Sequence, residues 1–378
     1  MFETARKYKW ALFFCTVSTF GALCYGYDQI YYTGLQGMRP FIDNYGTTRN
    51  HQGHVALTTT FISLTASIIY VGELLGALIS APINEYFGRK GVFYCASCCI
   101  IAGAIVQAAD KATMGLIILG RILIGLGVGQ FTTTSVLYIG ELAPEAVRGP
   151  ALMTFQLMQS CSQLVGSGIT QGTESIDSIA SYKIPMALLA GLPLAMLVLL
   201  PFIPESPIWY LRKGRGEDAI QAIRKVHKSE GPEYDHTEDL NVLHLAVERE
   251  RANEATSSWS SLFKDPIERR KLLYSCGAMV AQQINGIQFF YSYGVIFAQS
   301  IGISQPFTIS LITNVLQVVA VLVSVVLGNK VPRRANLLIT TIMMWCAFII
   351  IGGIGTMKPL PNGAAVGIVV VSYISKSL

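Results

Sequence analysis

The amino-acid sequence predicts an all-α membrane protein with about ten transmembrane helices. Of its 378 residues, 52% are hydrophobic and 13% are charged, whereas ordinary soluble domains carry about 25% charged residues. Long apolar stretches alternate with short charged clusters, and several reach the roughly 20 residues that a helix needs to cross a bilayer. Lipid is therefore the expected solvent for most of the chain. Lysines and arginines lie in loops between the apolar segments, so the net charge of +5 does not indicate nucleic-acid binding.

The apolar segments follow one another along the chain. The predicted helices span 11–30, 56–80, 91–109, 114–137, 151–171, 185–203, 272–298, 307–328, 335–355 and 365–378. The first segment follows a basic, polar start and is long enough to span, so it is not expected to be a cleavable signal. Short loops on the side of the N-terminus carry nine Lys and Arg, against five on the other side. Because positive charge accumulates in cytoplasmic loops, the N-terminus is predicted to be cytoplasmic.

One polar region divides the helices into two groups. Residues 1–203 are predicted to form a six-helix bundle, and residues 271–378 an incomplete second bundle of four helices. Between them, 204–270 reads as a cytoplasmic loop. Gly216 to Lys228 and Asp239 to Arg251 show helical apolar spacing, which predicts short amphipathic helices in this loop.

Two motifs in the apolar segments resemble a metal site and a nucleotide loop, but their sequence context argues against both functions. Cys95, Cys98 and Cys99 lie on one apolar helix without a partner pair of Cys or His, so we expect no metal site or other cofactor. All eight cysteines are expected to pack between helices as small apolar side chains. The repeat Gly125-Leu-Gly-Val-Gly129 lies within a helix and follows no strand, so it predicts close helix packing rather than a nucleotide loop.

Asp28, Glu73 and Arg121 are charged residues that lie within the predicted helices. Asp28 lies in the outer part of the first helix, where an intramembrane acid is expected to face a cavity or a partner. We interpret Asp28 as a proton-accepting carboxylate; the alternative is an interfacial Asp at the helix end. Glu73 lies deeper, in the second helix, and is predicted to pair with a cation such as Arg121 in the fourth, a structural role being favoured over a role in coupling. The candidate proton-coupling residues are therefore Asp28 and Arg121.

Amide side chains crowd the seventh predicted helix, and a second group lies in the fifth. Unpaired amides in hydrocarbon cost several kcal/mol each, so their density predicts a polar lumen. An amide offers both a donor and an acceptor, as sugar hydroxyl groups require. Hydrogen bonds between helices are the alternative. The residues are Gln282, Gln283, Asn285 and Gln288 in the seventh helix, and Gln156, Gln159 and Gln163 in the fifth.

The order of several motifs resembles the sugar-porter family of the major facilitator superfamily. These motifs are Gly26-Tyr27-Asp28, Asn84-Glu-Tyr-Phe-Gly-Arg-Lys90, Gly120-Arg121, Glu141-Leu-Ala-Pro-Glu-Ala-Val-Arg-Gly149, Pro204-Glu-Ser-Pro-Ile-Trp209 and Gln282-Gln-x-x-Gly-Ile287. The resemblance implies the major facilitator fold and transport of a sugar by alternating access. It favours a hexose-like monosaccharide, coupling to protons and a plasma-membrane location, while other members carry polyols, disaccharides or quinate-like acids.

The resemblance also implies roles for individual residues. Those implied to line the sugar site are Gln163, Gln282, Gln283, Gln288 and Gln317, the last at the position of the family's helix 8 Asn. Asp28 matches the residue linked to proton coupling. Those implied to form a cytoplasmic charge network that holds the outward-open state are Glu85, Arg89, Glu141, Arg148, Glu205 and Arg334.

The sequence also departs from the family pattern. Gln288 stands where Asn is usual, Ser292 replaces the first Tyr of a gating pair, and Ile208 replaces an Arg. The family continues through the rest of helix 10 and two further helices, whereas this sequence ends at Leu378. We therefore expect a C-terminally truncated bundle and no sugar transport by the 378-residue chain alone. The competing interpretation is a non-transporting sugar sensor or receptor. An enzyme is least expected, because the sequence shows neither a catalytic arrangement nor a phosphate-binding loop.

Overall fold

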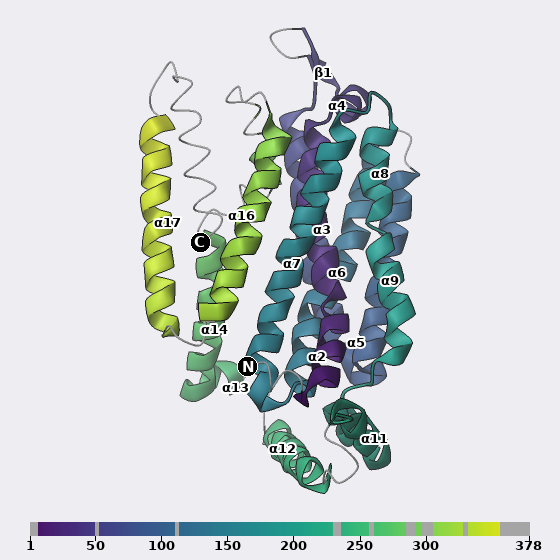
Figure 1. The fold of residues 1–378 in the computed structure, drawn as a ribbon, viewed down its shortest axis with the longest axis vertical. Coiled ribbons are helices and arrows are strands. Elements are labelled where there is room, and N and C mark those ends of the chain that lie inside the picture. Colours follow the sequence, from purple (N-terminus) through teal and green to yellow (C-terminus); the bar gives the residue numbers. More distant parts are fainter. Residues whose placement is uncertain are drawn as a thin grey trace.

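The computed structural model describes residues 7–49, 53–109, 113–229, 236–256, 261–284, 292–296, 299, 305–327 and 332–355. These residues form a bundle of long helices whose axes run roughly parallel (Figure 1). Five helical stretches in the described ranges are long and apolar enough to cross a membrane, namely Lys9–Gly37, Thr59–Ala108, Met114–Leu142, Ala180–Phe202 and Pro306–Val325. The chain is a multi-pass membrane protein of the predicted all-α class.

The first predicted helix consists of two consecutive helices, α2 (Lys9–Ser18) and α3 (Phe20–Gly37). At the break between them, the Ser18 hydroxyl donates to the Cys15 carbonyl at 2.7 Å and the Thr19 hydroxyl to the Thr16 carbonyl at 2.6 Å. Such bonds from a side chain to the preceding turn bend helices. A short helix, α4 (Arg39–Tyr45), and a hairpin of β1 (Thr48–Arg49) and β2 (Val55–Ala56) follow at one end of the bundle (Figure 1).

Helix α5 (Thr59–Ala108) contains both the second and the third predicted helix, joined at Gly88. Helix α6 (Met114–Leu142) packs along α5. The glycine repeat of α6 makes this packing close, because a Cβ at Gly125 would lie 2.4 Å from the Ile69 carbonyl oxygen and one at Gly129 would lie 2.1 Å from that of Glu73. The prediction that these glycines serve helix packing is confirmed.

Helix α7 (Glu145–Glu174) is the fifth predicted helix, and α8 (Ala180–Leu188), α9 (Gly191–Leu199) and the turn η1 (Leu200–Phe202) form the sixth. Four helices follow, of which α11 and α12 lie beneath the bundle at the end where the N-terminus lies (Figure 1). They are α10 (Pro207–Arg212), α11 (Gly216–Val226), α12 (His236–Thr256) and α13 (Ser261–Lys264). Helices α11 and α12 cover the two segments of the polar loop for which helices were predicted.

The second half contributes α14 (Pro266–Ile284), α16 (Pro306–Leu327) and α17 (Arg333–Gly355). Helix α16 packs against α7 of the first half, and the two run side by side in Figure 1. The helix predicted over 365–378 lies outside the described residues.

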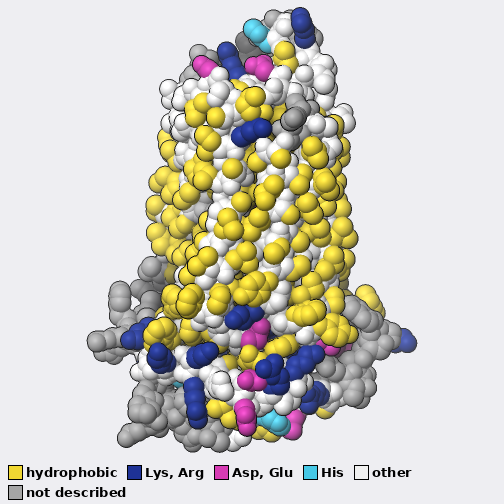
Figure 2. Space-filling model, turned by 90° about the vertical axis from the view of Figure 1, so that its right-hand side faces the viewer, with side chains coloured by type: hydrophobic (Ala, Val, Ile, Leu, Met, Phe, Trp, Pro, Cys, Tyr) yellow, Lys and Arg dark blue, Asp and Glu magenta, His cyan; other side chains and the backbone are white. Residues whose placement is uncertain are grey.

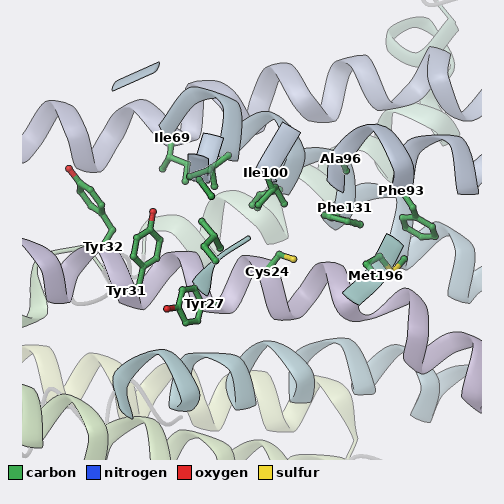
Figure 3. Close-up of a cluster of buried hydrophobic side chains, with 14 of the residues drawn as sticks. Cys24, Tyr27, Tyr31, Tyr32, Ile69, Phe93, Ala96, Ile100, Phe131 and Met196 are labelled. Carbon is green, nitrogen blue, oxygen red and sulfur yellow. The ribbon is translucent and has the colours of Figure 1, made fainter. Parts of the chain in front are cut away.

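The core of the first half is apolar and aromatic. Tyr27 and Tyr31 stack on one another along α3 with ring centroids 5.4 Å apart, and the cluster extends through Ile100 and Phe131 toward Met196 (Figure 3). The face of the molecule shown in Figure 2 is also apolar along most of its length, with Lys, Arg, Asp and Glu gathered mainly toward the lower end. An apolar belt between charged ends is the surface that a bilayer requires.

The cysteines only partly match the expectation that all of them pack between helices. Cys15 and Cys24 are buried, whereas Cys98, Cys276 and Cys346 are exposed on the outside of their helices. Lipid can cover an exposed thiol as it covers an apolar side chain, so a cysteine in an apolar segment need not face a neighbouring helix. Among the described residues, no group of His, Cys, Asp and Glu could hold a metal ion.

Candidate functional site

A buried ion pair joins the first and fourth transmembrane helices. Arg121 Nη1 on α6 donates to Asp28 Oδ1 on α3 at 2.9 Å, and the two side chains are 5% and 3% exposed. Arg121 Nε donates to the Thr65 carbonyl at 3.2 Å, and the guanidinium lies over the Tyr32 ring at 4.0 Å from its centroid. The expectation that Arg121 pairs with Glu73 is therefore corrected: Asp28 holds it. The free-energy cost of burying the Arg121 charge is offset by its ionic hydrogen bond, its bond to a carbonyl and its contact with an aromatic face.

A polar pocket adjoins this ion pair. Its polar and charged lining comes from α3, α5 and α6 and from residue 292 of the second half. The lining residues include Asp28, Gln29, Tyr70, Glu73, Arg121 and Ser292. The pocket thus brings two carboxylates and one guanidinium to a single space between the two halves.

A row of amides leads from α3 to the second half. Gln163 Nε2 on α7 donates to Gln29 Oε1 on α3 at 2.7 Å, and Gln317 Nε2 on α16 donates to Gln163 Oε1 at 2.7 Å. Gln159 Nε2, one turn before Gln163, lies 3.4 Å from the same Gln29 oxygen. Gln163 and Gln317 are buried. Amides from both halves therefore meet at one place and form hydrogen bonds with one another.

Sequence reasoning identified Gln163 and Gln317 but missed Gln29. The sequence could have indicated Gln29, since it is a polar residue within a spanning helix and directly follows Asp28. Of the other predicted sugar-site amides, Gln283 is exposed on α14, the side chain of Gln282 is not described, and Gln288 lies outside the described residues. Their convergence on the row stays a prediction.

Two described residues of the second half, Ser292 and Gln299, contact α3 or α5 near the pocket. The Thr33 hydroxyl donates to the Ser292 carbonyl at 3.3 Å, and the hydroxyls of Tyr70 and Ser292 lie 3.3 Å apart. Gln299 Nε2 donates to the Gly37 carbonyl at 3.1 Å, four residues beyond Thr33 on the same helix. The hydroxyl group of Ser292 thus lies within hydrogen-bond distance of a tyrosine of α5.

Part of the predicted charge network forms at the end of the bundle where the N-terminus lies. Arg89 Nε donates to Glu141 Oε2 at 2.7 Å, and Arg89 Nη2 bonds the other carboxylate oxygen of Glu141. The Glu205 carboxylate accepts from the backbone N–H groups of Arg89, Lys90 and Ser206 at 3.0, 3.0 and 2.9 Å. Burial raises the pKa of Glu205, while these three bonds and the charge of Arg89 oppose the rise.

The backbone at Gly88 makes this arrangement possible. Gly88 has φ 79° and ψ −177°, a conformation that is essentially restricted to glycine. A Cβ at this position would lie 2.5 Å from Glu205 Oε2. Glycine therefore turns the chain between the two halves of α5 and leaves space for the Glu205 carboxylate.

Among the described residues, three others of the predicted network take no part in its ion pairs. Glu85 is exposed, and its carbonyl accepts from Trp209 Nε1 at 3.0 Å. Arg148 Nε donates to the Ala143 carbonyl at 3.3 Å, and Arg334 is exposed on α17. In the part of the chain that the structure describes, none of these three forms a side-chain ion pair.

Comparisons with known proteins agree with this architecture. The family model described as "Sugar (and other) transporter" matches residues 14–375. The low-affinity glucose transporter HXT1 of Saccharomyces cerevisiae is 27% identical over 92% of this chain and 61% of its own length, and HXT3 of the same organism is 28% identical over 93% and 62%. The chain thus spans about 61% of the length of these relatives.

Solved structures share the fold. The proton:xylose symporter XylE bound to 6-bromo-6-deoxy-D-glucose, a major facilitator superfamily protein, has a TM-score of 0.78 at 19% identity, covering 98% of this chain and 79% of the other. A partially occluded inward-open form of XylE from E. coli has a TM-score of 0.70 at 20% identity, covering 97% and 84%. The described helices therefore adopt the major facilitator arrangement.

Proposed function

The chain belongs to the sugar (and other) transporter family, and from this membership we propose that its helices belong to a transporter that carries a hexose-like sugar across the membrane by alternating access, coupled to protons. The matched relatives are transporters rather than enzymes. Two of them are named as glucose transporters, which favours a hexose for this chain. The XylE structure is named as that of a proton symporter, which favours coupling.

The amide row supports the sugar site more than any other observation. Gln29 and Gln163 belong to the first half and Gln317 to the second, and each uses its amide on another amide of the row. A sugar hydroxyl group can both donate and accept, so it can replace either amide partner without leaving a buried polar group unpaired. Binding would then exchange hydrogen bonds between the halves for hydrogen bonds to substrate. We propose that Gln282, Gln283 and Gln288 complete this site.

The Asp28–Arg121 pair is the proposed proton site. Protonation of Asp28 removes the charge that holds Arg121, so the state of the proton alters the contact between α3 and α6. At the other end of the bundle, the ion pair of Arg89 and Glu141 and the bonds to Glu205 are proposed to stabilise one of the two access states. Charges that bond in one state and separate in the other shift the balance between the states.

The proposal includes an orientation and a division of the chain. We propose a cytoplasmic N-terminus, which places α11 and α12 in the cytoplasm, and a plasma-membrane location. Residues 1–203 would act as one rocking bundle and residues 271–378 would belong to the other, with 204–270 between them. The contact of α7 with α16 then lies at the interface about which the bundles move.

Binding of radiolabelled D-glucose to the purified protein in lipid nanodiscs tests the proposal. Gln163→Ala and Gln317→Ala should each weaken binding about tenfold or more, because truncation leaves a buried amide partner unpaired. Gln221→Ala, which removes an exposed amide on α11, is the matched control and should bind as the unmodified protein does. Absence of saturable binding, or equal affinity for all four proteins, would contradict the proposed site.

A further inference from the structure

We propose that Glu73 is the second carboxylate of the proton site and that Arg121 moves to it when Asp28 takes up a proton. The inference deepens the proposed function and rests on it for its role in transport. The exchange of partners itself concerns only the three side chains, so it can be tested without any sugar.

The packing of α5 on α6 brings Glu73 to Arg121. Arg121, Gly125 and Gly129 follow one another at intervals of four residues and therefore lie on one face of α6. A Cβ at Gly125 would lie 3.1 Å from the Glu73 nitrogen, and one at Gly129 would lie 2.1 Å from the Glu73 carbonyl oxygen. The face of α6 that carries Arg121 is thus the face against which Glu73 packs, with Arg121 one helical turn from the contact.

Glu73 shares the pocket with the ion pair. Among the residues that the structure describes, the titratable and charged groups that face this pocket are Asp28 and Tyr32 from α3, Arg121 from α6, and Tyr70 and Glu73 from α5. Asp28 is 2% exposed, whereas Glu73 is only partly buried. Glu73 is therefore the more exposed of the two carboxylates.

If Asp28 and Glu73 are both ionised, their two negative charges face the single positive charge of Arg121. Arg121 directs its donors to Asp28 and to the Thr65 carbonyl. Within the described ranges the Glu73 carboxylate forms no hydrogen bond or ion pair. Two carboxylates that share one cation in a poorly solvated site favour a state in which one of them carries a proton. With Arg121 on Asp28, that proton belongs on Glu73.

A proton exchange follows from this balance. A proton that binds to the Asp28 carboxylate forms an O–H bond and ends the attraction of Asp28 for Arg121. The guanidinium then pairs with Glu73, whose O–H bond breaks and releases its proton to the water of the pocket. One proton enters and one leaves, so the net charge of the pocket stays the same. The ion pair of Arg121 then links α6 to α5 instead of to α3.

Infrared spectroscopy of the protein in nanodiscs tests this exchange by following the C=O stretching band of protonated carboxyl groups across a pH titration. Glu73→Gln should remove one band that the unmodified protein shows at neutral pH. In Asp28→Asn the Glu73 band should persist, but its midpoint should fall by about 1 to 3 pH units, the usual effect of gaining a cationic neighbour. Asp43→Asn, which alters an exposed carboxylate on α4, is the control and should leave the Glu73 band unchanged.

Other outcomes would overturn the proposal. An unchanged Glu73 midpoint in Asp28→Asn would show that Arg121 does not move to it. Loss of the fold in Asp28→Asn would show that Glu73 does not replace Asp28 as partner. A third measurement is the thermal stability of Asp28→Asn/Glu73→Gln, which leaves Arg121 without a carboxylate and should be lower than that of either single variant. Failure of glucose binding with these results intact would refute the proposed function alone.

Discussion

Replacing Gly88 with alanine should destabilise the protein more than an ordinary glycine replacement in a helix, because two independent costs arise at this position. The first is conformational: a residue with a Cβ held at φ 79° incurs about 1–3 kcal/mol of backbone strain. The second is steric, since the new Cβ would lie 2.5 Å from Glu205 Oε2 and 2.8 Å from its Cδ. Overpacking of this kind costs about 1–3 kcal/mol. The two costs together give about 2–6 kcal/mol.

The added methyl group should also weaken the hydrogen bonds of Glu205. Its carboxylate can yield to the new methyl group only by lengthening its bonds to the N–H groups of Arg89, Lys90 and Ser206. Removal of the carboxylate in Gly88→Ala/Glu205→Ala should therefore relieve the steric part and leave the conformational part. The double variant is expected to lose less stability than the sum of the two single variants.

Thermal unfolding of the detergent-solubilised protein, followed by the loss of its monodisperse size-exclusion peak, measures the effect. Gly88→Ala should lower the midpoint by about 3–8 °C. The matched control is Gly140→Ala on α6, where an added Cβ would meet nothing within 4 Å and where alanine favours the helix by about 1 kcal/mol. Equal midpoints for Gly88→Ala and Gly140→Ala would refute the assignment of strain to Gly88, and strict additivity with Glu205→Ala would refute the steric part.

Two further predictions concern the charged groups. The first is tested in proteoliposomes of a transport-competent homologous protein that carries the equivalent of Asp28→Asn. The change should abolish uphill sugar uptake driven by a proton gradient and leave downhill exchange measurable. Undiminished accumulation of sugar would show that Asp28 has no part in coupling. Glu205 has a folded-state pKa raised above its ordinary value of 4.5, so the stability that its proton contributes is present below 4.5 and is lost as pH rises through the folded pKa. Glu205→Gln should flatten this decline in a pH series of thermal midpoints, and an unchanged slope would contradict the assignment.

The order of the helices could be predicted from the sequence because the lipid requirement acts on each segment separately. A segment of sufficient length and hydropathy must span, whatever its neighbours are. The turn between the two halves of α5 was also predictable in part, since charges at Arg89 and Lys90 interrupt the apolar run. That Gly88 makes the turn between these two helices, with φ 79° and ψ −177°, depends on backbone geometry, which hydropathy does not encode.

The partners of the polar residues could not be predicted in the same way. Asp28 and Glu73 are both acids within the membrane, and both line the pocket beside Arg121. Which of them holds the arginine depends on how α3, α5 and α6 are rotated about their axes. Periodicity shows which residues share a face of one helix, but it does not show which neighbour that face meets. The same limit explains why Gln317 could be identified by its position while its bond to Gln163 could not.

Helix α3 makes Asp28 and Gln29 move together. These two residues are consecutive, so their side chains leave the helix about 100° apart, and they reach different neighbours: Asp28 bonds Arg121 on α6, and Gln29 bonds Gln163 on α7. A turn of α3 about its own axis that withdraws Gln29 from Gln163 also shifts Asp28 against Arg121. One rigid helix therefore carries a residue of the proposed proton site and a residue of the proposed sugar site next to each other, so a rotation of α3 changes both contacts.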